Sequence, residues 1–340
     1  MTTFQFYPKC FPTTHTFYRR CLIPQSSDKF IDVSQGSSKL KTKIRQMEYL
    51  LTGDVGKLFG YDKLEKGSDM LYSNGPIYCG NKNWILDIMD NPFGMTGYNF
   101  NIFKKNIKQI ADSLEADNCK KIIVRSDDSI TIMRKYFSDK VINKISLEKV
   151  ELPKKEYVKK KKPYFQILMM GSINNPGDFY NKGGLIALEV FEKLSKAQNV
   201  KLVIRCDIPT EILTRVKNNP NIDCLNSKRL TDNEMNDLYE QSDILIATNP
   251  VMPFMVTLEA KAYNLPMICY DCFAIKSYIK DQENGFIIDP PEDIKAILQS
   301  EEYPSNLRTP EILKTLKKTD PIVINKICNI INNLINIKND

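Results

Sequence analysis

A glutamate, Glu259, lies inside an otherwise mostly apolar segment. Residues 249–265 read NPVMPFMVTLEAKAYNL. Short apolar runs on either side, at residues 243–248 and 266–270, predict buried parallel strands. The segment between them begins as a loop with two prolines and becomes a helix near Met255, which puts Glu259 about one turn inside that helix.

The position of Glu259 suits a ligand that carries both phosphate and sugar. In an open α/β sheet, ligands bind where strands end and helices begin, because unpaired backbone N–H groups and the positive end of the helix dipole gather there. An anion would sit at the helix start, and Glu259 could accept hydrogen bonds from sugar hydroxyls next to it. The alternative is that Glu259 caps the helix or pairs with Lys261 or Lys280, and this segment alone does not decide between the two.

The length and composition are those of a globular protein with two domains. The chain has 340 residues, of which 42% are apolar and 26% charged, so a sizeable core is available. No apolar run approaches the ~18–20 residues that cross a bilayer, and the N-terminus lacks the apolar core of a signal peptide. We therefore expect a cytoplasmic protein.

Cysteine usage predicts reduced thiols and no metal site. The nine cysteines have no framework spacing, which is typical of a reducing compartment. Cys269 and Cys272 form the one C-x-x-C pair that could bind a metal ion or act in redox chemistry. No second pair accompanies it, and the only histidine, His15, is far away in sequence, so we expect no metal cofactor.

A lysine cluster is the most conspicuous source of the net charge of +7. Lys154, Lys155 and residues 159–162 lie in a predicted linker between Pro153 and Pro163, and such a run is usually a solvated connector. A nucleotide phosphate, an anionic membrane surface and nucleic acid would each fit it, so peripheral membrane association stays open. We expect no nucleic-acid partner, because no nucleic-acid-binding motif accompanies the cluster.

The first half of the chain alternates strands and helices. Residues 84–89 predict a buried strand, and the turn-rich loop 90–97 follows it. In an open sheet such a loop faces the ligand crevice, which makes Asp87 and Asp90 the best acidic candidates in this half. The alternatives are that Asp87 pairs locally and that Asp90 opens a turn.

The second half repeats this alternation more clearly. Apolar runs that predict strands recur with helical segments between them, at residues 165–170, 200–205, 222–225, 243–248, 266–270 and 285–288. Parallel neighbours need crossover connections, so this order predicts an α/β fold with a doubly wound parallel sheet.

This pattern divides the chain into four parts. Residues 1–153 form an N-terminal Rossmann-like domain, 154–164 the lysine-rich linker, and 165–305 a C-terminal domain. Residues 306–340 contain helices, and the last one carries an apolar stripe that includes Ile327. We expect this stripe to pack back on the N-terminal domain.

Six segments, taken together and in order, resemble the donor domain of GT-B retaining glycosyltransferases of the family 4 type (glycosyl transferases group 1). They are Gly171-Ser172 and residues 178–184, 199–204, 230–243, 258–268 and 283–286. Their order and spacing are preserved over roughly residues 165–290. The first domain resembles the family only loosely.

The resemblance implies two Rossmann-like domains that face each other across a cleft, with the acceptor on the first and the nucleoside diphosphate sugar on the second. Glu259 resembles the second glutamate of the family's E-x7-E motif, which holds the nucleotide ribose. Lys182 resembles the lysine that neutralises the diphosphate. The N–H groups of Met255 and Val256 would bind phosphate or sugar oxygens.

Three positions depart from the family pattern. The first glutamate of the motif falls at Val251, which is apolar. The arginine often found soon after the glycine at Gly171 is Ser172 here, and we still expect both residues to contact the donor. The family's frequent histidine in the acceptor domain has no counterpart, and Asp90, in a comparable loop, is our candidate to replace it as a catalytic residue. These changes put the identity of the sugar, and activity itself, in question.

The resemblance implies a retaining, metal-independent glycosyltransferase that moves a sugar from a nucleoside diphosphate to a hydroxyl of a glycan, glycoprotein or lipid-linked acceptor. Breaking the bond to the diphosphate develops negative charge, which Lys182 and the helix N–H groups would stabilise in the transition state. The chain has no Asp-x-Asp metal motif, which agrees with this mechanism. The alternative is a sugar-nucleotide or glycan-binding protein without catalytic activity.

Overall fold

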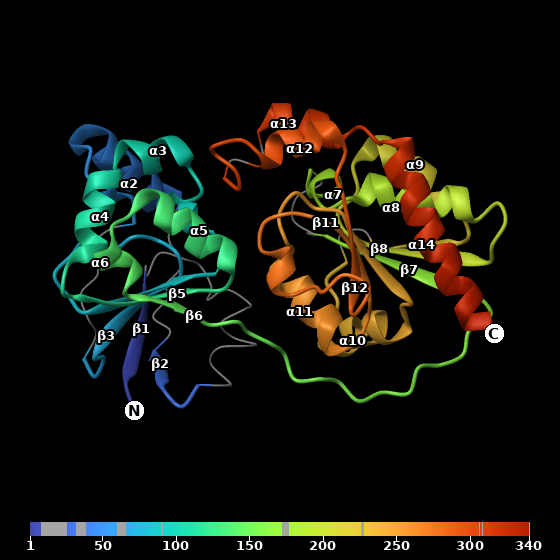
Figure 1. Cartoon of the computed structure of the whole chain (residues 1–340), viewed down its shortest axis with the longest axis horizontal. Coiled ribbons are helices and arrows are strands. Elements are labelled where there is room, and N and C mark those ends of the chain that lie inside the picture. Colours follow the sequence, from blue (N-terminus) through green and yellow to red (C-terminus); the bar gives the residue numbers. More distant parts are fainter. Residues whose placement is uncertain are drawn as a thin grey trace. The chain divides into compact units, whose positions relative to one another are not determined.

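The computed structural model describes residues 1–7, 26–31, 39–59, 66–89, 91–171, 177–225, 228–305, 307 and 309–339. The chain divides into two compact units (Figure 1). The N-terminal unit is Met1–Val150 with Pro304–Asn306, and the C-terminal unit is Glu151–Tyr303 with Leu307–Asp340. Within the described residues, none of the helices has the length and apolar character needed to cross a membrane.

The N-terminal unit is built on a six-stranded parallel sheet of order β2-β1-β3-β4-β5-β6. Its strands are β1 (Thr3–Tyr7), β2 (Lys29–Ile31), β3 (Met70–Ser73), β4 (Trp84–Ile88), β5 (Cys119–Val124) and β6 (Ile145–Leu147). Its helices are α2 (Lys39–Thr52), η2 (Val55–Leu58), η3 (Pro92–Thr96), α3 (Phe100–Lys105), α4 (Ile107–Glu115), α5 (Asp127–Tyr136) and α6 (Asp139–Ile142). Trp84 of β4 is fully buried in the core of this unit.

The C-terminal unit is built on a second six-stranded parallel sheet, of order β12-β11-β10-β7-β8-β9. Its strands confirm the six predicted ones: β7 (Phe165–Met170), β8 (Val200–Arg205), β9 (Ile222–Cys224), β10 (Ile244–Ala247), β11 (Met267–Tyr270) and β12 (Gly285–Ile288). Its helices are α7 (Asp178–Asn181), α8 (Gly184–Leu194), α9 (Thr210–Lys217), α10 (Asp232–Gln241), α11 (Phe254–Ala262), η4 (Ile275–Ser277), α12 (Glu292–Leu298), α13 (Pro310–Leu316) and α14 (Pro321–Asn339).

Local signals explain where these elements begin. Every residue of β7 is buried, Gln166 included, as expected for a central strand that is covered on both faces. Helix α10 begins with a capping box: the Thr231 hydroxyl accepts from the Glu234 N–H at 3.3 Å, and the Glu234 carboxylate accepts from the Thr231 N–H at 2.8 Å. The box directs the chain from β9 into the crossover that leads to β10.

The last helix, α14, packs on α8 of its own unit (Figure 1). Ile327 and Ile331 are fully buried, and the Cys328 thiol lies 3.9 Å from the carbonyl oxygen of Val190 on α8. The expected packing of residues 306–340 on the N-terminal domain is therefore wrong for this helix. An amphipathic stripe shows that a helix must bury one face, but it does not name the partner.

Two lysines of the predicted linker are bound rather than solvated. The ammonium of Lys159 lies 2.9 Å from Asp243 Oδ1, and Lys338 of α14 lies 3.0 Å from the same oxygen. Lys162 lies 3.9 Å from the other carboxylate oxygen. Burial alone would raise the pKa of Asp243, but the Gln166 N–H and the Lys159 ammonium outweigh it and hold that pKa below its usual value. The linker is thus fastened to the start of β10.

Candidate functional site

The strand order of the C-terminal sheet reverses between β7 and β10. From β7 the chain continues through β8 and β9 on one side, whereas β10 is followed by β11 and β12 on the other. Gly171 follows β7, and Thr248 follows β10. Open parallel sheets bind ligands at the carboxyl ends of the strands where the order reverses, so the candidate site lies here.

Two glycines allow backbone segments to approach closely at this edge. A Cβ on Gly171 would lie 2.4 Å from the Cys206 sulfur. A Cβ on Gly183 would lie 2.2 Å from the Thr248 hydroxyl oxygen, and Gly183 also has a φ of +77°. Only glycine fits both constraints, so Gly183 fixes the start of α8 against the end of β10. Ser172, which was expected beside Gly171 in the donor loop, lies outside the described residues.

Lys182 directly precedes Gly183. Its backbone N–H donates to the carbonyl of Asp178 at 2.8 Å, which closes α7, and its side chain is half-buried. Burial raises the pKa of the Cys206 thiol to about 12, and Arg205 and Lys182 oppose this rise. Both cations therefore lower the pKa of a thiol at the carboxyl edge of β8, next to the point where the strand order reverses.

The start of α11 offers backbone donors at the same edge. The helix begins at Phe254, after Pro253, and no side chain caps it. The Thr257 N–H already donates to the Pro253 carbonyl at 2.9 Å, so the N–H groups of the first turn, which include Met255 and Val256, are the ones that a ligand can use. The helix begins next to Met255, as expected from the sequence, and the role of these N–H groups stays a prediction.

Three buried polar side chains around this helix start lack partners within the described part of the chain. They are the Thr248 hydroxyl, the Asn249 amide nitrogen and the Thr257 hydroxyl. All three residues are at most 2% exposed. Buried polar atoms without partners are uncommon and need an explanation, and a bound ligand or ordered water would supply one. Sequence reasoning missed these residues because hydroxyl and amide side chains after a strand are unremarkable in a pattern.

Glu259 is held from the neighbouring helix. The Tyr239 hydroxyl on α10 donates to Glu259 Oε2 at 2.6 Å. Tyr239 is 1% exposed and stacks on Tyr263, with 5.4 Å between the ring centroids and 10° between the ring planes. Lys261 pairs with Glu151, and Lys280 pairs with Glu283. These ion pairs differ from the local pairings with Glu259 that the sequence left open.

Val251 and the cysteine pair lie in packed surroundings. Val251 is half-buried and forms an isolated β-bridge with Phe273. Cys269 and Cys272 are buried, and burial raises the pKa of the Cys269 thiol to about 12. Among the described residues, no group of three metal-ligating side chains occurs.

In the N-terminal unit, Asp87 has a structural role. Its carboxylate accepts from the Tyr72 hydroxyl at 2.6 Å and from Arg125 Nε at 3.1 Å. Burial raises the pKa of Asp87, and the Arg125 guanidinium opposes the rise. Asp87 therefore ties β3, β4 and the end of β5 together, through residues distant in sequence rather than by the local pairing considered as the alternative. Asp90 lies outside the described residues, so its catalytic role stays a prediction.

A family comparison bears on the C-terminal unit. Residues 164–300 match the family Glycosyl transferases group 1. The match begins at β7 and includes Lys182, the start of α11 and Glu259. Among curated proteins, none matches the chain.

Solved structures extend the likeness to both units. The Anabaena protein Alr3699/HepE, in complex with UDP and glucose, matches with a TM-score of 0.50 and 12% identity over 98% of this chain and 99% of HepE. The pneumococcal O-GlcNAc transferase GtfA, in complex with UDP and GlcNAc, matches with a TM-score of 0.51 and 14% identity over 86% of this chain and 54% of GtfA. TarM matches with a TM-score of 0.45 and 14% identity over 75% of this chain and 45% of TarM. The chain thus spans about half of TarM and GtfA. The predicted GT-B fold, with its two parallel α/β sheets, is confirmed by the first two likenesses.

Proposed function

We propose that the protein is a retaining glycosyltransferase that moves a sugar from a nucleoside diphosphate to a hydroxyl acceptor. One observation carries the proposal. At the point where strand order reverses, the uncapped start of α11 lies among three buried polar groups without partners in the described residues. A ligand with phosphate and hydroxyl groups would supply partners for the helix start and for the Asn249 and Thr257 side chains.

The diphosphate fits the start of α11 and Lys182. Negative charge grows on the departing diphosphate as its bond to the sugar breaks, and donors and cations fixed in place stabilise that charge without reorganising. Removing one such group commonly lowers the rate roughly a hundredfold or more. We assign this role to Lys182 and to the N–H groups of Met255 and Val256, with Gly171 in the adjoining loop.

Glu259 fits the ribose. Because Tyr239 donates to one of its oxygens at 2.6 Å, the carboxylate is held in one orientation and can accept from ribose hydroxyls with little loss of side-chain entropy. The HepE and GtfA structures are both complexes with UDP, which supports UDP-sugars as the first donors to examine.

The proposed transfer needs neither a metal ion nor a carboxylate at position 251. The acceptor oxygen bonds to C1 of the sugar on the face from which the diphosphate leaves, and the departing diphosphate takes the proton of the acceptor hydroxyl. Because attack and departure use the same face, the sugar keeps its anomeric configuration. Lys182 and the α11 dipole supply the positive charge that a metal ion provides in other transferases. Asp90 stays our proposed catalytic residue on the acceptor side.

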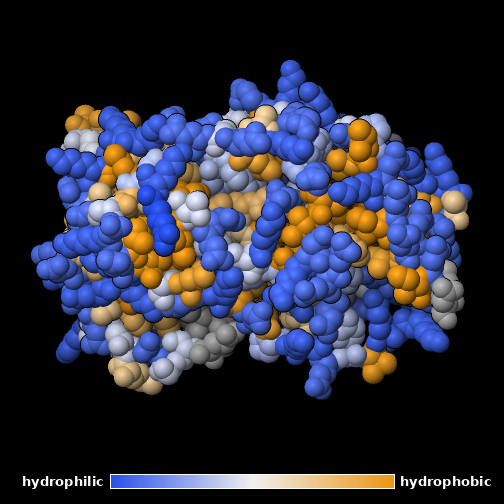
Figure 2. Space-filling view, viewed as in Figure 1, coloured by the Kyte–Doolittle hydropathy of each residue, from blue (hydrophilic) through white to orange (hydrophobic). Residues whose placement is uncertain are grey.

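We further propose that the N-terminal unit docks on an anionic membrane through α2, where a lipid-linked acceptor would lie. Four apolar residues of α2 are exposed: Ile44 at 47%, Met47 at 60%, Leu50 at 77% and Leu51 at 83%. Their spacing places them on one side of the helix, and hydrophobic residues gather at the end of this unit where α2 lies (Figure 2). In the part of α2 whose side chains are described, the basic residues Lys43 and Arg45 outnumber the one acidic residue, Glu48, which suits an anionic surface.

Release of nucleoside diphosphate tests the proposed activity. The purified protein is incubated with UDP-sugars, GDP-sugars and ADP-sugars, with and without candidate acceptors. We expect one donor to be consumed and Lys182→Ala to slow its consumption about a hundredfold. Saturable binding of a donor with no release in any mixture would support the non-catalytic alternative instead.

A further inference from the structure

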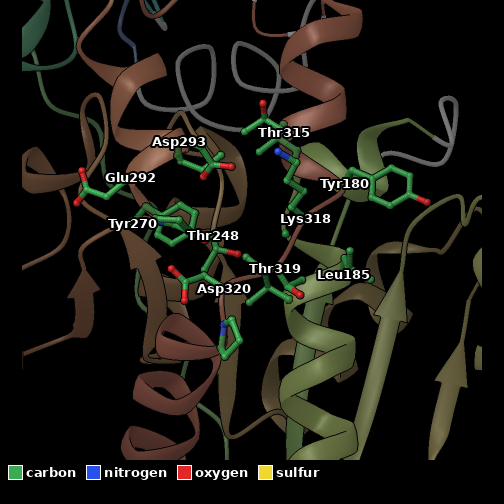
Figure 3. A pocket seen from close by; sticks show the side chains of 16 residues that line it. Tyr180, Leu185, Thr248, Tyr270, Glu292, Asp293, Thr315, Lys318, Thr319 and Asp320 are labelled. Atoms are coloured by element: carbon green, nitrogen blue, oxygen red, sulfur yellow. The ribbon is translucent and has the colours of Figure 1, made fainter.

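A cavity next to Thr248 has a lining that includes no residue of α11. It has a volume of about 340 Å³ and lies wholly within the C-terminal unit. Its walls come from the start of α8, the ends of β10 and β11, the start of α12 and the connection between α13 and α14 (Figure 3). This volume is at the lower end of the range for pockets that bind small molecules, roughly 300–1,000 Å³.

The charges that line the cavity disfavour phosphate. Asp293 and Asp320 both face Tyr270 closely enough to add to the rise in the pKa of its phenol that burial causes. Lys318 is the cation in the lining, whereas Glu292 already pairs with Lys295 at 2.7 Å. A diphosphate here would meet two carboxylates, so the cavity does not extend the phosphate site at α11.

The lining suits a ligand that carries hydroxyl groups on an otherwise apolar ring. Carboxylates are strong acceptors for hydroxyl donors, and the Thr248 hydroxyl is buried with no partner in the described residues. Leu185, Ile186 and the ring of Tyr270 supply apolar surface in the same cavity. One carboxylate oxygen of Asp320 accepts from the Ile322 N–H at 2.7 Å, which fixes that side chain at the start of α14.

We propose that this cavity is a binding site for a neutral, hydroxyl-rich molecule of monosaccharide size. The site shares only its wall, Gly183 and Thr248, with the proposed donor site, and its lining does not include Lys182, Glu259 or the start of α11. It therefore holds its ligand alongside a nucleotide rather than in place of one. The inference goes beyond the proposed transfer and does not require it.

Ligand-observed NMR titrations of the full chain with glucose, galactose, N-acetylglucosamine and myo-inositol test the site. We expect saturable binding of at least one of them, unaffected by saturating UDP. Asp293→Ala and Thr248→Val should each weaken it about tenfold, because each removes one polar contact. Asp289→Ala is the matched control, because Asp289 is a nearby exposed carboxylate outside the cavity lining, and it should bind as the wild type does.

Thr248→Val also has a readout without ligand. It replaces a buried, unpartnered hydroxyl by a methyl group of similar size, so the melting temperature of the free protein should stay the same or rise. Asp293 is exposed, so Asp293→Ala should fold even if Thr248→Val does not. The proposal is overturned by the absence of saturable binding, by displacement of the sugar by UDP, or by wild-type affinity in Asp293→Ala.

Discussion

The Tyr239 hydroxyl on α10 donates a 2.6 Å hydrogen bond to Glu259 on α11. The tyrosine that makes this bond is fixed by its own stack on Tyr263, and the Tyr263 carbonyl accepts in turn from the Tyr157 hydroxyl in the linker, at 2.6 Å. A chain of contacts thus runs from the linker to the carboxylate that we assign to the ribose. The orientation of Glu259 depends on a residue that no ligand needs to touch.

Tyr239→Phe keeps the ring and removes the hydroxyl that donates to Glu259. We expect the Kd for the nucleotide and the KM for the donor to rise about tenfold, with kcat changed little, because the loss acts on ribose binding in ground state and transition state alike. Steady-state kinetics and calorimetry measure the two constants.

Tyr263→Phe is the control for that change. It removes a hydroxyl that donates to Asn236 on α10 but keeps the stack on Tyr239. Its nucleotide affinity should be that of the wild type. Equal losses in the two variants would show that general packing, and not the orientation of Glu259, sets the affinity.

Gly183→Ala should destabilise the C-terminal unit by more than backbone strain alone. The φ of +77° costs about 1 kcal/mol for a residue with a Cβ, and crowding against Thr248 adds about 1–3 kcal/mol. Urea unfolding measures the difference. Gly53→Ala is the control, since Gly53 has a φ of +68° and no atom within 4 Å of an added Cβ.

A double variant isolates the contact between Gly183 and Thr248. Thr248→Ala removes the hydroxyl oxygen that an added Cβ would meet, so it should recover part of the stability that Gly183→Ala loses. Equal losses in Gly183→Ala and Gly53→Ala, without recovery in the double variant, would contradict the close approach of α8 to β10.

Leu50→Glu on α2 should weaken binding to vesicles about tenfold, because it replaces an apolar contact with the bilayer by a charge that the anionic surface repels. Folding should be unaffected, since Leu50 is 77% exposed. Sedimentation with phosphatidylcholine vesicles, with and without phosphatidylserine, measures the binding. Val158→Glu changes an apolar residue that is 92% exposed in the linker, and it should bind as the wild type does. Equal binding of all three proteins would exclude α2 as the docking surface.

Asp243 should make the C-terminal unit sensitive to acid. Its pKa is lower in the folded protein than in the unfolded chain, so its stabilising contribution is complete above the unfolded pKa of about 4 and is lost as pH falls through the lower folded pKa. The stability of Asp243→Asn should fall less than that of the wild type between about pH 6 and pH 3, as measured by urea unfolding. Asp223→Asn, at a half-exposed pair with Lys201, should follow the wild type.

The C-terminal sheet could be predicted from the sequence because most of its strands are short, mainly apolar runs that alternate with helical segments. The first strand, Thr3–Tyr7, was not predicted, because its short alternation lies within a longer segment that has no clear period. β6 has three residues, which is too short for a period to appear. The partner of α14 was also beyond the sequence, because an apolar stripe is the same whichever surface it covers.

The candidate site was predicted in part. Glu259, Lys182, Gly171, Met255 and Val256 all lie on elements at the carboxyl edge of one sheet, since the motif residues follow its strands. The supporting residues were missed: Tyr239 lies 20 positions from Glu259, and a distant hydrogen bond leaves no local pattern. For Asp87 a signal did exist, because Arg125 follows the next predicted strand and a buried carboxylate beside an arginine usually pairs with it.

The central claim is that the start of α11, Lys182 and Glu259 form a nucleotide-sugar site. The most direct measurement is the melting temperature of the protein with UDP, GDP, ADP and their sugar conjugates, for the wild type, Lys182→Ala, Glu259→Ala and the control Lys295→Ala. One nucleotide should stabilise the wild type and the control, by about 2.7 kcal/mol at a hundred times its Kd, and neither site variant at the same concentration. No stabilisation by any nucleotide, or equal stabilisation of all four proteins, would contradict the account.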